Sequence, residues 1–153
     1  MPQYIDSYYL VDSRSPRLVY DLFANYGFVK EELADDYPIP QYSSEPTIIF
    51  YSDAELLDYM EENSYCEYIV YWRNVVKNPV INQVTLSYTN DGKMIFGISI
   101  VGREVDSAES IAVFKDVKKY LNARIACITG EEPPPGNSIE FLEFCSEKYI
   151  PAD

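Results

Sequence analysis

The chain of 153 residues carries 12 basic and 25 acidic side chains, giving a net charge of −13, and it contains no histidine. This charge disfavours nucleic acid and anionic membranes as ligands, because both require a basic footprint. The missing histidine removes the usual general base and the commonest zinc ligand. Cys66, Cys127 and Cys145 are scattered and odd in number, which indicates buried thiols and neither a zinc site nor a disulfide framework. We therefore expect no enzyme activity, no catalytic residue, no metal and no cofactor.

The length and the apolar fraction of 47% suit one domain over residues 1–153. No apolar run approaches the roughly 20 residues needed to span a bilayer. The first ten residues also lack the basic and apolar blocks of a signal peptide. We expect a cytoplasmic protein.

The N-terminal part begins with β-favouring residues at 4–11. A helix follows, because Ser15 and Pro16 suit its start and Gly27 suits the position after its end. Residues 30–46 are acidic and carry three prolines, so we expect an irregular surface loop there. Its apolar side chains would hold it against the body of the protein.

The middle of the chain starts with a short strand at 47–51. Ser52 and Glu55 form a capping box that begins a second helix. Residues 66–72 alternate and are apolar on both sides, which predicts either a fully covered central strand or a strand with one exposed aromatic face. Residues 73–82 are expected to be an irregular connection.

Residues 84–101 give the strongest signal, two alternating apolar runs separated by Asn90, Asp91 and Gly92. Asp-Gly between such runs predicts a β-hairpin, since the tight turn needs the positive φ that glycine reaches without strain. An apolar hairpin of this kind must lie inside a larger sheet. Gly97, within the second run, is expected to permit a bend or close packing.

The C-terminal part contains a helix from residues 106–107 to about Leu121, a buried strand at 124–129 and a proline-rich acidic loop at 130–136. From Ser138 the pattern fits either helix or strand, with Ile139, Leu142 and Cys145 as the repeating apolar residues. Adjacent strands between helices predict an α+β fold. We expect a single domain with a mostly antiparallel central sheet and about three helices.

Tyrosine is the other unusual feature, because fifteen tyrosines exceed what a core can supply with hydroxyl partners. Several tyrosines lie beside acidic segments, a combination that suits a basic protein partner: carboxylates meet Lys and Arg, and rings stack on guanidinium groups. The alternatives are that the paired carboxylates form an ordinary solvated face and that about half of these tyrosines are merely half-buried at the margin of the sheet. The candidate partner-binding residues are Glu31, Glu32, Asp35, Asp36, Tyr37, Asp58, Glu61, Glu62, Glu131 and Glu132.

Residues 88–102, Y-T-N-D-G-K-M-I-F-G-I-S-I-V-G, precede a predicted helix and a short strand. This part of the chain resembles the central portion of certain bacterial immunity proteins, which protect cells against polymorphic toxins, including those of contact-dependent growth inhibition. The resemblance implies a small protein that binds one toxin domain tightly and blocks its active site or its folding partner. Many such toxins are nucleases with basic clefts, and the resemblance transfers no binding residue to this chain.

We therefore expect a toxin-neutralising immunity protein that binds a basic toxin domain through an acidic, tyrosine-rich surface, and that is a monomer or weak dimer in isolation. A second hypothesis is a small-ligand-binding protein or enzyme that uses carboxylates and tyrosines in a cleft. A third is a structural subunit in which the strand at 66–72 pairs with a copy of itself. A deep apolar pocket with converging acidic and tyrosine side chains would favour the second hypothesis.

Overall fold

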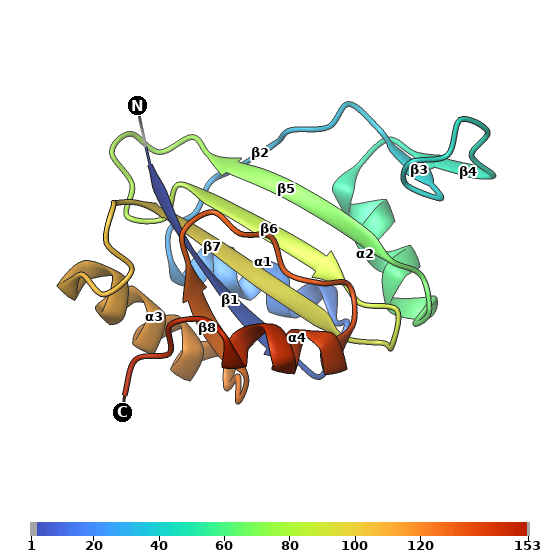
Figure 1. Ribbon diagram of the computed structural model, residues 1–153. Helices are drawn as coiled ribbons and strands as arrows, with labels where there is room; N and C mark the ends of the chain where they lie inside the picture. Colours follow the sequence, from blue (N-terminus) through green and yellow to red (C-terminus); the bar gives the residue numbers. More distant parts are fainter. Residues whose placement is uncertain (1–2, 153) are drawn as a thin grey trace.

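A computed structural model describes residues 3–152 and shows a six-stranded antiparallel sheet in the order β2-β5-β6-β7-β1-β8 (Figure 1). A separate pair, β3 with β4, projects from the sheet as a short arm. The strands are β1 (Tyr4–Val11), β2 (Lys30–Glu32), β3 (Tyr37–Ile39), β4 (Ile48–Phe50), β5 (Tyr68–Asn74), β6 (Gln83–Tyr88), β7 (Met94–Val101) and β8 (Ala126–Thr129). The helices are α1 (Pro16–Asn25), α2 (Asp53–Glu62), α3 (Ala108–Leu121) and α4 (Ser138–Ser146).

The predicted single α+β domain with a mostly antiparallel central sheet is confirmed, although residues 3–152 form four helices where about three were expected. None of the helices within residues 3–152 is long and apolar enough to cross a membrane.

The predicted hairpin forms the centre of the sheet as β6 and β7. Leu86 lies opposite Phe96 and Val84 opposite Ile98, so the apolar residues of both arms share one face. Gly92 has φ of +89° at the turn, the conformation for which glycine was expected. The pairing follows from the alternation seen in the sequence, and the turn follows from its Asp-Gly step.

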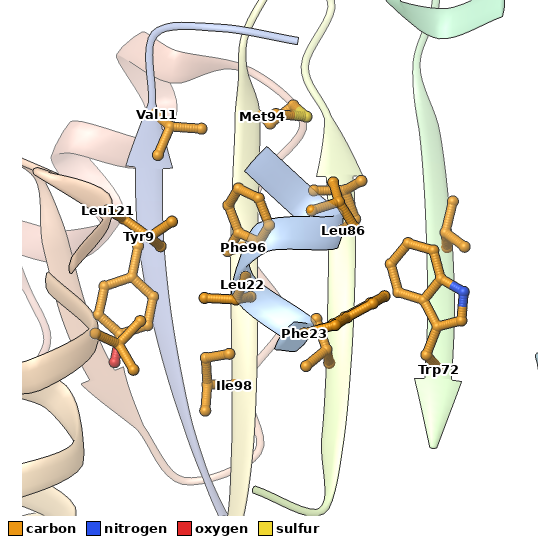
Figure 2. Packing of buried hydrophobic residues seen from close by; sticks show 14 of the residues in the cluster. Tyr9, Val11, Leu22, Phe23, Trp72, Leu86, Met94, Phe96, Ile98 and Leu121 are labelled. Atoms are coloured by element: carbon orange, nitrogen blue, oxygen red, sulfur yellow. The ribbon is translucent and has the colours of Figure 1, made fainter. Parts of the chain in front are cut away.

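The helices α1, α2 and α3 cover the face of the sheet to which these hairpin residues point. Figure 2 shows Leu22 and Phe23 of α1 lying over Phe96 and Leu86, with Trp72 of β5 beside Phe23. The Phe23 and Trp72 rings meet edge to face, with their centroids 5.2 Å apart. We call this side the covered face, and it holds the larger of the two apolar clusters.

The opposite side of the sheet carries α4, which packs against β8, β1 and β7 (Figure 1). The predicted choice between helix and strand is thereby resolved as helix. The expected apolar repeat is wrong, because Ile139 is 76% exposed and Leu142 is 54% exposed, whereas Phe141 and Cys145 are buried. The segment is apolar on several sides, so its spacing did not determine which side would be covered.

Residues 30–46 differ from the expected irregular loop, because they include β2 and β3. β2 is only three residues long and pairs with the end of β5, where Glu31 lies opposite Arg73. The prolines do exclude helix, as predicted. Strand pairing here depends on a distant partner, which local sequence does not reveal.

Arg14 is a buried cation that the sequence did not identify as structural. Its guanidinium donates to the carbonyl oxygens of Met60 at 3.0 Å, Asn63 at 2.8 Å and Cys66 at 3.0 Å, and also to that of Thr89. These bonds satisfy the C-terminal end of α2 and fasten it to the sheet. Burial lowers the pKa of Arg14, and the nearby Tyr88 ring, 5.1 Å from the guanidinium carbon, opposes that shift.

Candidate functional site

The side of the sheet opposite the covered face is only partly shielded, and we call its part over β5, β6 and the adjoining half of β7 the open face. Strand alternation places Tyr71 of β5, Thr85 of β6 and Gly97 of β7 side by side there. Tyr71 is 43% exposed, whereas Trp72, which points to the covered face, is fully buried. Of the two predicted environments for this strand, the structure therefore has the one with an exposed aromatic side chain.

Two segments border the open face. One is residues 40–43, which lead from the β3 arm. The other is the loop 130–137, which leaves β8 and crosses the sheet to the β6–β7 turn (Figure 1), where the backbone N–H of Asn90 donates to the carbonyl of Gly136 at 3.0 Å. Gly136 lies so close to Glu67 that an added Cβ would collide with that carboxylate. Two distant parts of the chain thus face one another across β5 and β6.

Between these segments lie two neighbouring hollows of about 440 Å³ and about 360 Å³, which share four lining residues. The shared residues are Gln41, Tyr42, Tyr68 and Ile69, and we call the two hollows together the tyrosine groove. Asp36 lines the smaller hollow and Glu67 the larger.

Gln41 holds one wall of the tyrosine groove against β5. Its side-chain amide donates to the carbonyl of Ile69 at 2.8 Å and accepts from the Ile69 N–H, also at 2.8 Å. The amide therefore occupies the position that a neighbouring strand would take beyond the end of β2. At the other edge of the sheet, the N–H of Ile128 donates to the carbonyl of Tyr149 at 2.8 Å, so this edge is also protected against pairing with another chain.

The electrostatics of the groove are acidic. Burial raises the pKa of Tyr68 to about 12, and the charge of Asp36 adds to that shift. The Tyr68 hydroxyl therefore stays neutral and available as a donor at physiological pH. Among the described residues that line the two hollows, none is a lysine or an arginine. Tyr42, at 82% exposed, presents its ring at the surface where the two hollows meet.

Asp6 adds a half-buried carboxyl on the same side of the sheet. It lies opposite Ser99, whose hydroxyl donates to it, and opposite Thr129 on the other neighbouring strand. Burial raises the pKa of Asp6, the Ser99 hydrogen bond lowers it, and the charge of Glu131 raises it further. Next to this group, Gly97 has no room for a side chain, because a Cβ would collide with Thr85 and Tyr8. The predicted role of Gly97 in close packing is confirmed.

The predicted partner-binding residues fall into three places. The first is this side of the sheet, where Asp36 lines the tyrosine groove and its neighbour Asp35 is exposed. Glu131 and Glu132 lie in the loop that crosses the sheet, and Glu132 forms a salt bridge with Lys148 at 2.9 Å. Glu31 forms a salt bridge with Arg73.

The second place is the contact of β2 and β3 with α2, where Glu32 is exposed and Tyr37 is buried. Tyr37 is 2% exposed and donates from its hydroxyl to Glu32 at 2.7 Å. Glu32 also accepts from the backbone N–H of Asp53 at 2.9 Å, at the start of α2. Asp53 in turn is buried and accepts from the indole N–H of Trp72 at 2.8 Å. Glu32 and Tyr37 therefore serve the packing of α2 against β5.

The third place is α2, where Asp58, Glu61 and Glu62 are exposed. This helix packs on the covered face, so its carboxylates lie on the other side of the sheet from the tyrosine groove. The charge of Asp58 contributes to raising the pKa of Tyr20 on α1, after the larger effect of burial. The expectation that the candidate residues do not all share one face agrees with this arrangement.

Sequence reasoning missed Gln41, Glu67 and residues 134–136 as parts of the groove. Glu67 was hidden because it precedes a strand and has no acidic neighbour. Gln41 stands among prolines and gave no sign of its pairing with β5. The alternation of Ile69 and Tyr71 with buried residues was the signal that could have located the open face.

Comparison of the chain with protein-family models, with curated proteins and with solved structures gave no match.

Proposed function

We propose that this protein is a bacterial immunity protein that neutralises a basic toxin domain of the nuclease class by binding the basic side chains of its active-site region. The observation that carries the proposal is the tyrosine groove: an acidic hollow lined by aromatic side chains, with no lysine or arginine among its described lining residues. Two features of the composition, a net charge of −13 and the absence of histidine, also favour a protein that binds a partner over an enzyme.

The chemistry of the groove suits an arginine or lysine of a partner. Asp36 and Glu67 supply carboxylates at its two hollows, and Tyr42 and Tyr71 supply exposed rings. A guanidinium group can stack on such rings while it donates to a carboxylate, and both contacts gain strength as water is excluded. Aromatic anchors in a depression are also where the binding energy of protein interfaces concentrates.

The proposal is tested by co-expressing the tagged chain with the product of the neighbouring upstream gene. We expect a stable complex with a basic toxin domain whose activity is abolished in the complex and returns after the two are separated. Purification of the toxin domain in fully active form, with no complex at micromolar concentrations, would contradict the proposal.

The site is tested by reversing charge on the two sides of the sheet. Asp36→Lys combined with Glu67→Lys should slow association about tenfold at low salt, because opposite charges steer the encounter. The matched control is Glu61→Lys combined with Glu62→Lys on α2, which changes net charge equally and should have a much smaller effect. Equal effects of the two pairs, or tight binding that is insensitive to salt, would count against the tyrosine groove as the binding site.

A further inference from the structure

A third hollow lies on the helix side of the sheet, between the end of α1, the loop 75–82 and α3. Its volume is about 650 Å³, and it shares no lining residue with the tyrosine groove. Most of its wall is apolar, formed by Val76, Val80 and Val113 together with the buried Ile81. This volume is within the range of small-molecule sites, about 300–1,000 Å³.

One polar group interrupts this apolar wall. The hydroxyl of Tyr26 donates to the carboxylate of Asp116 at 2.5 Å, and both residues line the hollow. Burial raises the pKa of Tyr26 and the bond to Asp116 raises it further, so the tyrosine remains a neutral donor. A carboxylate accepts several hydrogen bonds, and among the described residues no lysine or arginine forms a salt bridge with Asp116.

The walls of the hollow are held in place before any ligand arrives. The side-chain oxygen of Asn74 accepts from the N–H groups of Val29 at 3.2 Å and Val76 at 3.1 Å, and its NH₂ group donates to the carbonyl of Ile81 at 2.9 Å. A single side chain therefore ties the loop to the segment between α1 and β2, and also joins the two ends of the loop. Edge-to-face packing of Tyr26 on Tyr120, with centroids 5.7 Å apart, fixes the other end. A preformed pocket loses less conformational entropy on binding.

We propose that this hollow binds a small organic cation, an amine with an alkyl or aryl body. The apolar body would lie against the valines, and the ammonium group would donate to Asp116 beside the Tyr26 hydroxyl. A charge-assisted bond of this kind is about twice as strong as a neutral one, and the protein's net negative charge raises the local concentration of cations. This hollow shares no lining residue with the tyrosine groove, and it has the apolar walls with acidic and tyrosine side chains that the small-ligand hypothesis expects.

The test uses cyclohexylamine, which is charged at neutral pH, and cyclohexanol, which presents the same ring without the charge. Both are titrated into the isotopically labelled full chain and followed by methyl NMR. We expect saturable shifts confined to Val76, Val80 and Val113, and about tenfold tighter binding of the amine, because its hydrogen bond to the carboxylate is charge-assisted. Equal affinities, or no saturation of either compound at millimolar concentrations, would overturn the proposal.

Two variants separate the charge from the shape. Asp116→Asn keeps an acceptor for Tyr26 but removes the negative charge, so the amine should lose its advantage over the alcohol. Ala112→Leu fills part of the hollow from α3 and should weaken both compounds. Glu62→Gln removes the same charge on α2 and should change neither.

An amine affinity that survives Asp116→Asn would overturn the assignment of Asp116. If a lysine-containing peptide binds here and free amines do not, the proposed small ligand is wrong and the hollow binds a protein partner. Charge reversal at Asp36 and Glu67 leaves this pocket intact, so failure of one proposal does not imply failure of the other.

Discussion

The two faces of the sheet are built from alternate residues of the same strands, yet they serve different ends. On β5, Trp72 is completely buried under α1 while the adjacent Tyr71 remains 43% exposed. The covered face is apolar and closed by three helices. The other face is shielded by α4 over β8, β1 and β7, and its remainder holds polar side chains and the tyrosine groove. The larger apolar cluster thus lies on the covered face, and the smaller one lies under α4 on the other.

The largest expected effect is a loss in free energy of unfolding on the covered face, compared with the loss for a residue of the open face. Phe96→Ala removes a fully buried ring from beneath α1 and should lower the free energy of unfolding by about 3–5 kcal/mol. Tyr71→Ala should lower it by less than about 1 kcal/mol, because its ring is partly in water already. Urea denaturation of the two variants measures both values. A Tyr71→Ala loss as large as that of Phe96→Ala would show that the open face is part of the core.

The second expected effect concerns the end of α2. Arg14→Met retains the apolar length of the side chain but leaves four carbonyl acceptors without their donor, and should cost about 3 kcal/mol. Arg17→Met, at an arginine whose side chain is 86% exposed, is the control and should be nearly neutral. Similar thermal midpoints for the two variants would refute the structural role assigned to Arg14.

A smaller effect is expected at the wall of the tyrosine groove. Gln41→Met keeps the length of the side chain but removes both bonds to Ile69, so we expect a loss of about 1–2 kcal/mol. The more specific result is faster hydrogen exchange of the Ile69 amide, with that of Val70 unchanged. Exchange at Ile69 that stays as slow as before would mean that Gln41 does not protect this edge.

The smallest effect is a dependence on pH at Asp6. Because burial raises its pKa above the ordinary value of 3.8, the folded protein holds this proton more tightly than the unfolded chain. The contribution of Asp6 to stability therefore falls as pH rises through that raised pKa. Asparagine stays neutral at every pH, so the advantage of Asp6→Asn over the unchanged protein in free energy of unfolding should be smallest near pH 3. This advantage should grow as pH rises and level off above the raised pKa of Asp6. An advantage that instead shrinks with rising pH would contradict the assigned direction.

The sequence revealed the features that depend on near neighbours. The β6–β7 hairpin could be predicted because its alternation and its Asp-Gly turn are local. The start of α2 could be predicted from the spacing of Ser52 and Glu55, and in the structure the Ser52 hydroxyl accepts from the N–H of Glu55 at 3.3 Å. Ser15 was also placed correctly at the start of α1, although its side chain makes no capping bond.

The remaining features depend on residues far apart in the chain. β2 forms by pairing with the distant β5, and the groove forms because residues 40–43 and 134–136 line the same hollow. Composition predicted an acidic, tyrosine-rich surface but could not separate Asp36, which lines the groove, from Glu32, which supports α2. Both carboxylates are exposed, and the hydrogen bonds that Glu32 accepts from Tyr37 and Asp53 distinguish it from Asp36; such bonds are not visible in sequence spacing.

The central claim is that the protein binds its partner through the open face, and hydrogen–deuterium exchange measures this most directly. Exchange would be compared for the chain alone and for its complex with the co-purified toxin domain. We predict slower exchange in peptides covering residues 40–43, 67–71 and 130–136, with little change in α2. Protection confined to α2, with residues 67–71 and 130–136 exchanging as in the free protein, would contradict the account.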